Sequence, residues 1–99
     1  MMNSYRINLT LLNTDGGLDP LVRALNVVRR GKVNVKAITA SFNRDAINVD
    51  IYVEGVEDEV NWVCNKLNKL YDVVKVSYTA TASISIPEAQ VSLMGERNG

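Results

Sequence analysis

Hydrophobic and polar residues alternate along four stretches of the chain, as expected for strands with one covered face. The stretches are residues 5–12, 33–42, 47–54 and 74–86. In the second, Ile38 and Ala40 interrupt the polar side, and we expect that side to be buried elsewhere. The fourth exceeds the about five or six residues of a typical strand, which predicts an extended strand or arm that ends at Pro87.

Two other stretches have the 3.6-residue period of amphipathic helices. For the first we expect Asp19 to be the N-cap, Pro20 to open the helix, and Gly31 to end it in the left-handed conformation. The second covers residues 56–70, with acidic side chains in its first turn and lysines in its last. Its apolar stripe is Val56, Val60, Val63, Leu67 and Leu70.

The order of these elements is strand, helix, strand, strand, helix, strand, with a short turn between the second and third strands. This order predicts an α+β, ferredoxin-like βαββαβ fold: a four-stranded antiparallel sheet with both helices on one face. A length of 99 residues allows one domain. We assign residues 1–86 to it and residues 87–99 to a flexible or partner-dependent tail.

Composition removes several classes of function. Eleven basic and eleven acidic residues cancel, so no basic field attracts nucleic acid. Histidine is absent, and the single cysteine, Cys64, forms neither a disulfide nor a CxxC motif, so we expect no catalytic residue and no metal site. No apolar run reaches the ~20 residues of a membrane span, and we expect a cytoplasmic protein.

Three segments carry a resemblance to a known family. They are residues 25–38 (LNVVRRGKVNVKAI), residues 47–55 (INVDIYVEG) and residues 65–76 (NKLNKLYDVVKV). With them the sequence resembles an ACT domain, and within that class the small regulatory subunit of acetohydroxyacid synthase (acetolactate synthase) in its short, single-domain form.

The resemblance implies a non-catalytic homodimer that binds and activates a catalytic subunit of branched-chain amino acid biosynthesis. It implies no cofactor for this chain, whereas the partner subunit is expected to use thiamine diphosphate, Mg²⁺ and FAD. It also implies feedback inhibition by valine, leucine or isoleucine bound between protomers.

In the family, the effector lies beside a loop with an Asn-x-Pro-Gly pattern, opposite an Asn-Ile pair on the partner protomer. The matching loop here comprises Asn13, Asp15, Gly16, Gly17 and Leu18, with Asp15 in place of the proline. The matching pair is Asn34 and Val35. Glycine lets backbone N–H groups approach a carboxylate, and the helix N-terminus that follows adds positive potential.

Other interpretations stay open at this point. The loop is also explained as a simple turn, because Asn, Asp and Gly tolerate left-handed backbone angles. An ACT-domain amino-acid sensor for another enzyme or regulator is the main alternative function, and an RNA-binding module of the same element order is a remote one. We expect Cys64 to be a buried structural thiol, and Trp62 to lie either at the core's edge or in an interface.

Overall fold

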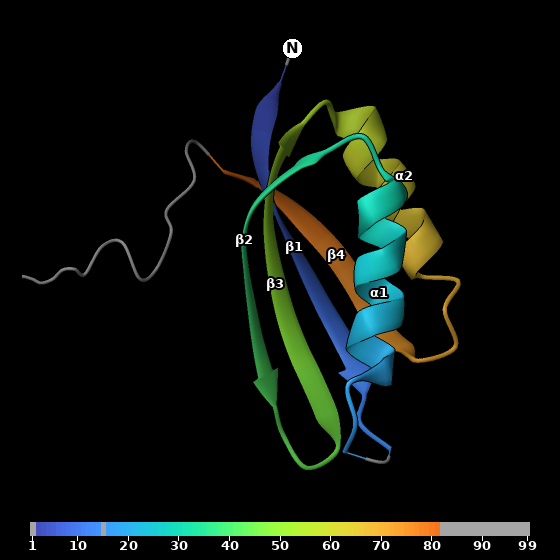
Figure 1. The fold of residues 1–99 in the computed structure, drawn as a ribbon. Helices are drawn as coiled ribbons and strands as arrows, with labels where there is room; N and C mark the ends of the chain where they lie inside the picture. Colours follow the sequence, from blue (N-terminus) through green and yellow to red (C-terminus); the bar gives the residue numbers. More distant parts are fainter. Residues whose placement is uncertain (1, 15, 82–99) are drawn as a thin grey trace, which may run out of the picture.

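The computed structural model describes residues 2–14 and 16–81 of the chain. They form strands and helices in the predicted order, and both helices lie on one side of the sheet (Figure 1). The bounds are β1 Asn3–Leu12, α1 Asp19–Arg30, β2 Asn34–Phe42, β3 Ala46–Gly55, α2 Glu57–Leu67 and β4 Val73–Thr81.

The sheet has the strand order β2-β3-β1-β4, and every neighbouring pair is antiparallel. β2 and β3 form the predicted hairpin, whereas β1 lies between β3 and β4 because each helix carries the chain across the sheet. The ferredoxin-like α+β prediction is confirmed. It leaves β2 and β4 as the two edge strands.

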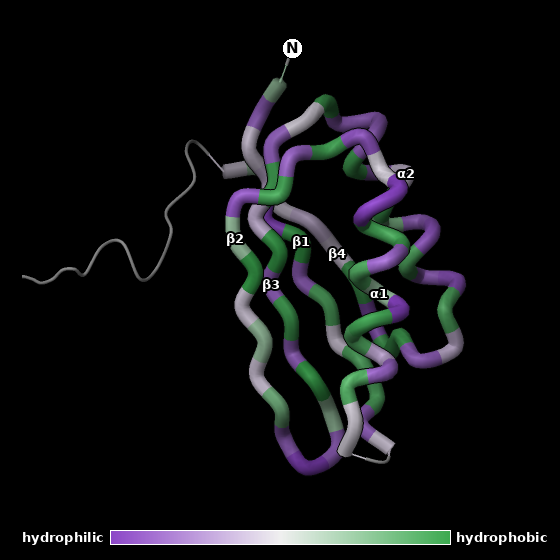
Figure 2. Tube along the Cα trace, viewed as in Figure 1, coloured by the Kyte–Doolittle hydropathy of each residue, from purple (hydrophilic) through white to green (hydrophobic). Residues whose placement is uncertain are grey.

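The core lies between the sheet and the two helices. Alternate residues of β1 and β3 point into it, and Figure 2 shows the resulting alternation of hydrophobic and hydrophilic positions along both strands. The helices contribute one face each. Its buried apolar side chains are Tyr5, Ile7, Leu9, Leu11, Ala24, Val27, Val28, Ile47, Val49, Ile51, Val53, Val60, Val63, Cys64 and Leu67.

Two irregularities in strand pairing change which side chains face the helices. β2 pairs with β3 in a register that shifts between Val35 and Ala37, so Ile38 lies opposite the buried Ile51. The expectation that Ile38 and Ala40 lie on the polar side is therefore wrong, because one inserted residue reverses the faces of all that follow. A second shift, between Thr10 and Leu11, leaves Val74 of β4 exposed.

The ends of α1 also differ from expectation. Leu18 is the N-cap, and Asp19 lies in the first turn without capping it through its side chain. Gly31 is extended, with φ −78° and ψ 159°, so it is not the predicted left-handed residue. Packing explains the glycine instead: a Cβ atom there would lie 2.3 Å from Cγ2 of Val63 on α2.

The predicted apolar stripe of α2 is confirmed at Val60, Val63 and Leu67. Val56 precedes the helix as its N-cap and is exposed. The predicted boundary between residues 86 and 87, the tail, and the arm formed by residues 82–86 all lie outside the described residues. Among the described residues, no helix is long and apolar enough to cross a membrane.

Candidate functional site

The predicted effector loop joins β1 to α1 and is bonded to the hairpin turn after β2. The side-chain amide of Asn13 donates to the carbonyl oxygen of Asn43 at 2.7 Å, and its oxygen accepts from the backbone N–H of Gly16 at 3.1 Å. The backbone N–H of Asn13 donates to Asp45 at 3.1 Å. The Asn13 amide thus holds the loop in shape, with a remaining hydrogen and lone pair for any effector.

Glycine is required at one loop position for its backbone. Gly16 has φ +74°, and the space around a Cβ there is open. Leu18, at the end of the loop, exposes its side chain, and its carbonyl oxygen accepts from Val22 to begin α1. The loop therefore lies at a helix N-terminus, where backbone N–H groups favour an anion. Asp19 in the first turn carries a negative charge beside the same place.

The other half of the predicted site lies at the far end of β2. Asn34 and Val35 begin this strand, whereas Phe42 ends it beside the turn that holds the loop. Eight residue steps of about 3.3 Å put roughly 26 Å between the two ends. One chain therefore does not bring Asn34 to the loop, and the two halves meet only if a second chain supplies one of them.

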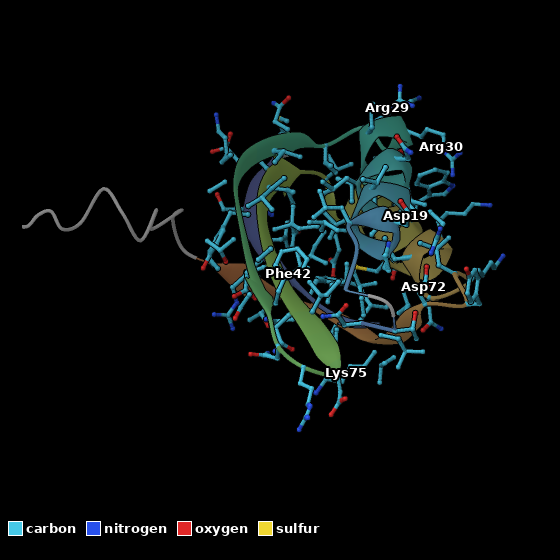
Figure 3. All side chains as sticks on the ribbon, turned by 60° about the horizontal axis from the view of Figure 1, so that its bottom comes forward. Asp19, Arg29, Arg30, Phe42, Asp72 and Lys75 are labelled. Carbon is cyan, nitrogen blue, oxygen red and sulfur yellow. The ribbon has the colours of Figure 1, made fainter. Side chains whose placement is uncertain are left out.

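β2 carries an apolar strip that the helices leave uncovered. Val35, Ile38, Ala40 and Phe42 lie opposite buried residues of β3, on the helix side of the sheet; we call them the β2 strip. Val35, Ile38 and Phe42 are 43, 42 and 46% exposed. In Figure 3, Phe42 on β2 stands apart from the helix layer that carries Asp19, Arg29 and Arg30. Leu18 and Val22 extend the exposed apolar surface onto α1.

An ion pair connects α1 to the segment just before β4, at the edge of the sheet opposite β2. Nη2 of Arg23 lies 2.6 Å from Oδ2 of Asp72, which is only 4% exposed, and Nε donates to the same oxygen. The hydrogen bond to Asp72 raises the pKa of Arg23. The Arg23 guanidinium also stacks over Tyr71, with its carbon 5.3 Å from the ring centroid. The sequence did not indicate this pair.

The uncovered face of the sheet is polar. The Asn8 amide donates to Asp50, and Thr10 donates to Asn48 at 3.4 Å. With Lys75 and Ser77 these side chains border a shallow hollow of about 360 Å³. The alternation along residues 47–54 predicts that Asn48 and Asp50 lie on this face, but it does not indicate the hollow.

The remaining predictions concern Cys64, Trp62 and metal binding. Cys64 is buried, as predicted, and burial raises the pKa of its thiol to about 11. Trp62 is 37% exposed, with the Lys66 ammonium 5.6 Å from its ring centroid. Among the described residues, no group of three or more His, Cys, Asp or Glu side chains is placed to hold a metal ion.

These features define a ferredoxin-like domain with a glycine-containing loop at a helix N-terminus. A family model described as "ACT domain" matches residues 17–76. The chain therefore belongs to the ACT domain family. ACT domains are typically regulatory domains that bind amino acids.

Solved structures with the same fold include ACT domains and other proteins. The ACT domain from GTP pyrophosphokinase of Chlorobium tepidum has a TM-score of 0.70 and 14% identity, covering 80% of this chain and 100% of that one. A homoserine dehydrogenase from Thiobacillus denitrificans has a TM-score of 0.64 and 16% identity, over 81% of this chain and 17% of that one.

The likeness extends beyond ACT domains. The 30S ribosomal protein S6 from Thermotoga maritima has a TM-score of 0.63 and 11% identity, over 82% of this chain and 89% of that one. At these identities the likenesses establish the fold alone, because one fold hosts many functions. A search of curated proteins gave no significant match.

Proposed function

We propose that this chain is the regulatory subunit of an acetohydroxyacid synthase. In this function it forms a homodimer, binds the thiamine-diphosphate-dependent catalytic subunit and raises its activity. Branched-chain amino acids bound between the protomers then inhibit the complex. Membership of the ACT family supports a regulatory role, and the resemblance of residues 25–38, 47–55 and 65–76 supports this particular enzyme.

The observation that carries the proposal is the β2 strip on an unpaired sheet edge. Antiparallel pairing of two β2 strands would join two four-stranded sheets, satisfy backbone groups along both edges, and bury both strips. It would also bring Asn34 of the partner close to Phe42, beside the loop that Asn13 holds. A two-fold dimer of this kind completes two effector sites, each built from both chains.

Cytoplasmic localisation and partner cofactors belong to the same proposal. This chain would hold none of the thiamine diphosphate, Mg²⁺ or FAD. Its contribution is allosteric: effector binding must favour one arrangement of the dimer, and the catalytic subunit must distinguish the two.

The first experiment is affinity purification of the tagged chain from its native lysate at low and moderate salt, with mass spectrometry of the co-eluting proteins. Recovery of a thiamine-diphosphate-dependent synthase supports the proposal. The purified pair is then assayed with and without this chain, and titrated with valine, leucine and isoleucine. Absence of activation by this chain would contradict the proposal.

A mixing experiment tests whether the effector site is shared. Asn13→Ala and Asn34→Ala each damage both sites of their own homodimer. In a mixed dimer, one site receives an intact loop and an intact Asn34. Random mixing should therefore restore about a quarter of all effector sites, measured by calorimetry. No recovery on mixing, with both variants still dimeric, would place the site within one chain.

The main alternative is an ACT-domain sensor that serves another enzyme. The two ACT-related structures above belong to a GTP pyrophosphokinase and a homoserine dehydrogenase, so the same fold occurs in different enzymes. Recovery of a different enzyme in the purification, activated or inhibited by the chain, would favour this alternative.

A further inference from the structure

The second edge of the sheet, along β4, borders a groove that the proposed function does not use. The groove has a volume of about 380 Å³ and lies between β4 and one flank of α2; we call it the β4 groove. Its lining residues are Asn61, Cys64, Asn65, Asn68, Val76, Ser77 and Tyr78. Tyr78 donates a hydrogen bond to Glu57 at 2.9 Å, toward the start of α2.

Three asparagines form the α2 rim of this groove. None of the side chains of Asn61, Asn65 and Asn68 hydrogen-bonds to another residue in the described part of the chain. Asparagine is a poor helix former, and Asn61 and Asn65, which lie inside α2, therefore weaken it without a side-chain hydrogen bond in return, whereas Asn68 is the C-cap. Asn61 and Asn65 are about 6 Å apart along the helix, close to the ~6.8 Å repeat of an extended backbone.

The backbone edge of β4 beside this groove is bare. In the described residues β4 pairs with β1 alone, and its segment 76–81 carries no charged side chain. Exposed uncharged edges of this kind readily pair with another strand. The hydroxyl oxygen of Thr81, the last residue of β4, is buried without a hydrogen-bond partner among the described residues.

The chain continues past Thr81 with five residues that alternate in the same phase. Ala82, Ile84 and Ile86 are apolar, Ser83 and Ser85 are polar, and Pro87 follows. In β4 the residues at even positions, Val76 and Tyr78, pack against the core, whereas Ser77 borders the polar hollow. The sequence of residues 82–86 thus matches the two faces of β4.

We propose that residues 82–86 of a second copy add to the β4 edge as an antiparallel strand, with a two-fold axis at Thr81. In this register Ile84 lies opposite Tyr78 and Ile86 opposite Val76, on the helix side, where both enter the β4 groove. Ser85 lies opposite Ser77 on the polar face. Each copy lends its segment to the other, so both edges are covered at once.

The proposed pairing places Pro87 and Thr81 at positions that suit them, at its two ends. Pro87, which cannot donate to a ladder, falls opposite Lys75, next to the bulge that already interrupts β4 at Val74. At the axis the two Thr81 hydroxyls face each other and can hydrogen-bond across the strands. The free edge of the added strand then faces the amides of Asn61 and Asn65.

A segment folding back on its own β4 fits less well. A tight turn at residues 82–83 would place Pro87 and Glu88 beside Tyr78 and Ser77, within the groove itself. Pro87 would then break the ladder in its middle, and Ile84 would lie on the face of Thr81. Exchange between copies is therefore the arrangement that we test.

The test is cysteine trapping in the full-length chain with Cys64→Ala as background. Thr81→Cys places two thiols at the axis, where opposed Cα atoms are about 4.5 to 5.5 Å apart, within disulfide range. We expect a disulfide-linked dimer on a non-reducing denaturing gel after mild oxidation. Ser83→Cys is the matched control, because its two copies would lie about 14 Å apart. Equal cross-linking of both variants, or none at Thr81→Cys, would overturn the proposal.

A second pair of variants tests the groove itself in the Thr81→Cys chain. Ile84→Asp puts a charge into the β4 groove and should slow cross-linking by at least about tenfold. Ser85→Asp, its neighbour on the polar face, should leave the rate nearly unchanged. Equal effects of the two substitutions would contradict the proposed faces. Thermal melting of each variant checks that the domain still folds.

Discussion

The helices cover the two edge strands of the sheet to different extents. On the β4 side, α2 packs closely enough to bury Cys64 and Leu67, and the Arg23–Asp72 ion pair ties α1 to the chain just before β4. On the β2 side, neither helix of the described residues covers the strand (Figure 1). Ile38 and Phe42 are therefore nearly half exposed on the face that is buried elsewhere in the sheet. The helix layer is thus displaced toward β4.

This difference indicates which edge of the sheet contributes more to the affinity between two copies. The β2 strip offers apolar side chains that are exposed and already held in place by β3, so their burial against a second copy releases water at little entropic cost. The β4 edge offers mainly backbone groups and amides. We therefore expect β2 contacts to dominate affinity and β4 contacts to add specificity.

The largest expected effect comes from a charge in the β2 strip. Ile38→Asp would bury two carboxylates and lose two isoleucines in each dimer, so at about 2 kcal/mol per side chain dimerisation should weaken on the order of a thousandfold. Analytical ultracentrifugation over a concentration series measures this. The effector response should disappear with the dimer.

Ser41→Asp provides the control for that experiment. Ser41 lies opposite Asn48 on the other face of β2, and its side chain is exposed. It should dimerise like the unmodified chain. Because exchange at the β4 edge would also give a dimer, both variants are compared in a chain that carries Ile84→Asp. If Ile38→Asp stays dimeric in that chain while the protein remains folded, β2 is not the interface.

The sequence predicted the regular parts of both edges and failed at single inserted residues. The alternation along β1 and β3 is unbroken, so every buried side chain of these strands could be assigned. In β2 the shift near Lys36 reverses the pattern, and only pairing with β3 reveals it. The same reason explains why the β2 strip could not be recognised: in the sequence, Ile38 and Ala40 interrupt a polar side.

The loop of the candidate site could be predicted from the sequence, but the long-range contacts around it could not. Asn13 and Gly16 were matched through the loop pattern of the family that the sequence resembles, and their residue types also fit a turn with positive φ. The bond from Asn13 to Asn43 spans 30 residues, and the Arg23–Asp72 pair spans 49, and no local pattern encodes such contacts. The separation of Asn34 from the loop follows from the length of β2 alone.

The close packing of the two helices is tested at Gly31, where the end of α1 contacts Val63 of α2. Gly31→Ala places a Cβ atom 2.3 Å from Cγ2 of Val63, which forces the helices apart. Overpacking of this kind should destabilise the fold by about 1 to 3 kcal/mol, measured by urea unfolding. Val63→Ala makes room, so in the double variant part of the loss should be recovered. Strictly additive losses would mean that the two residues do not touch.

The tightness of the β4 side is tested through Cys64. Its raised pKa, about 11 against an ordinary value of 9.0, means that burial favours the neutral thiol. The stability that this thiol contributes is full below pH 9 and is lost as pH rises toward 11, because the unfolded chain ionises first. At pH 8, the difference between these two pKa values makes the thiolate of the folded chain about 100-fold rarer than that of the unfolded chain. Labelling of Cys64 at pH 8 should therefore be at least about 100-fold slower in the folded chain.

Cys64→Ala isolates this contribution. The variant should lack the part of the stability loss between pH 9 and 11 that belongs to the thiol, whereas every other contribution to the pH dependence is common to both chains. Rapid labelling of the folded protein at pH 8 would show that α2 does not seal this side.

The smallest effect is expected in the loop at the end of β2. Gly16→Ala adds a methyl group in open space, so its cost comes from φ +74° alone, about 1 kcal/mol. The loop can relieve this strain by turning away from Asn13, which would break the hydrogen bond from Gly16 without touching the β2 strip. Dimerisation should therefore be unchanged, while the affinity for effector falls, as measured by calorimetry. Gly16→Asn, which tolerates positive φ, should restore most of the binding; if it does not, Gly16 serves the close approach of the ligand to the backbone rather than the shape of the turn.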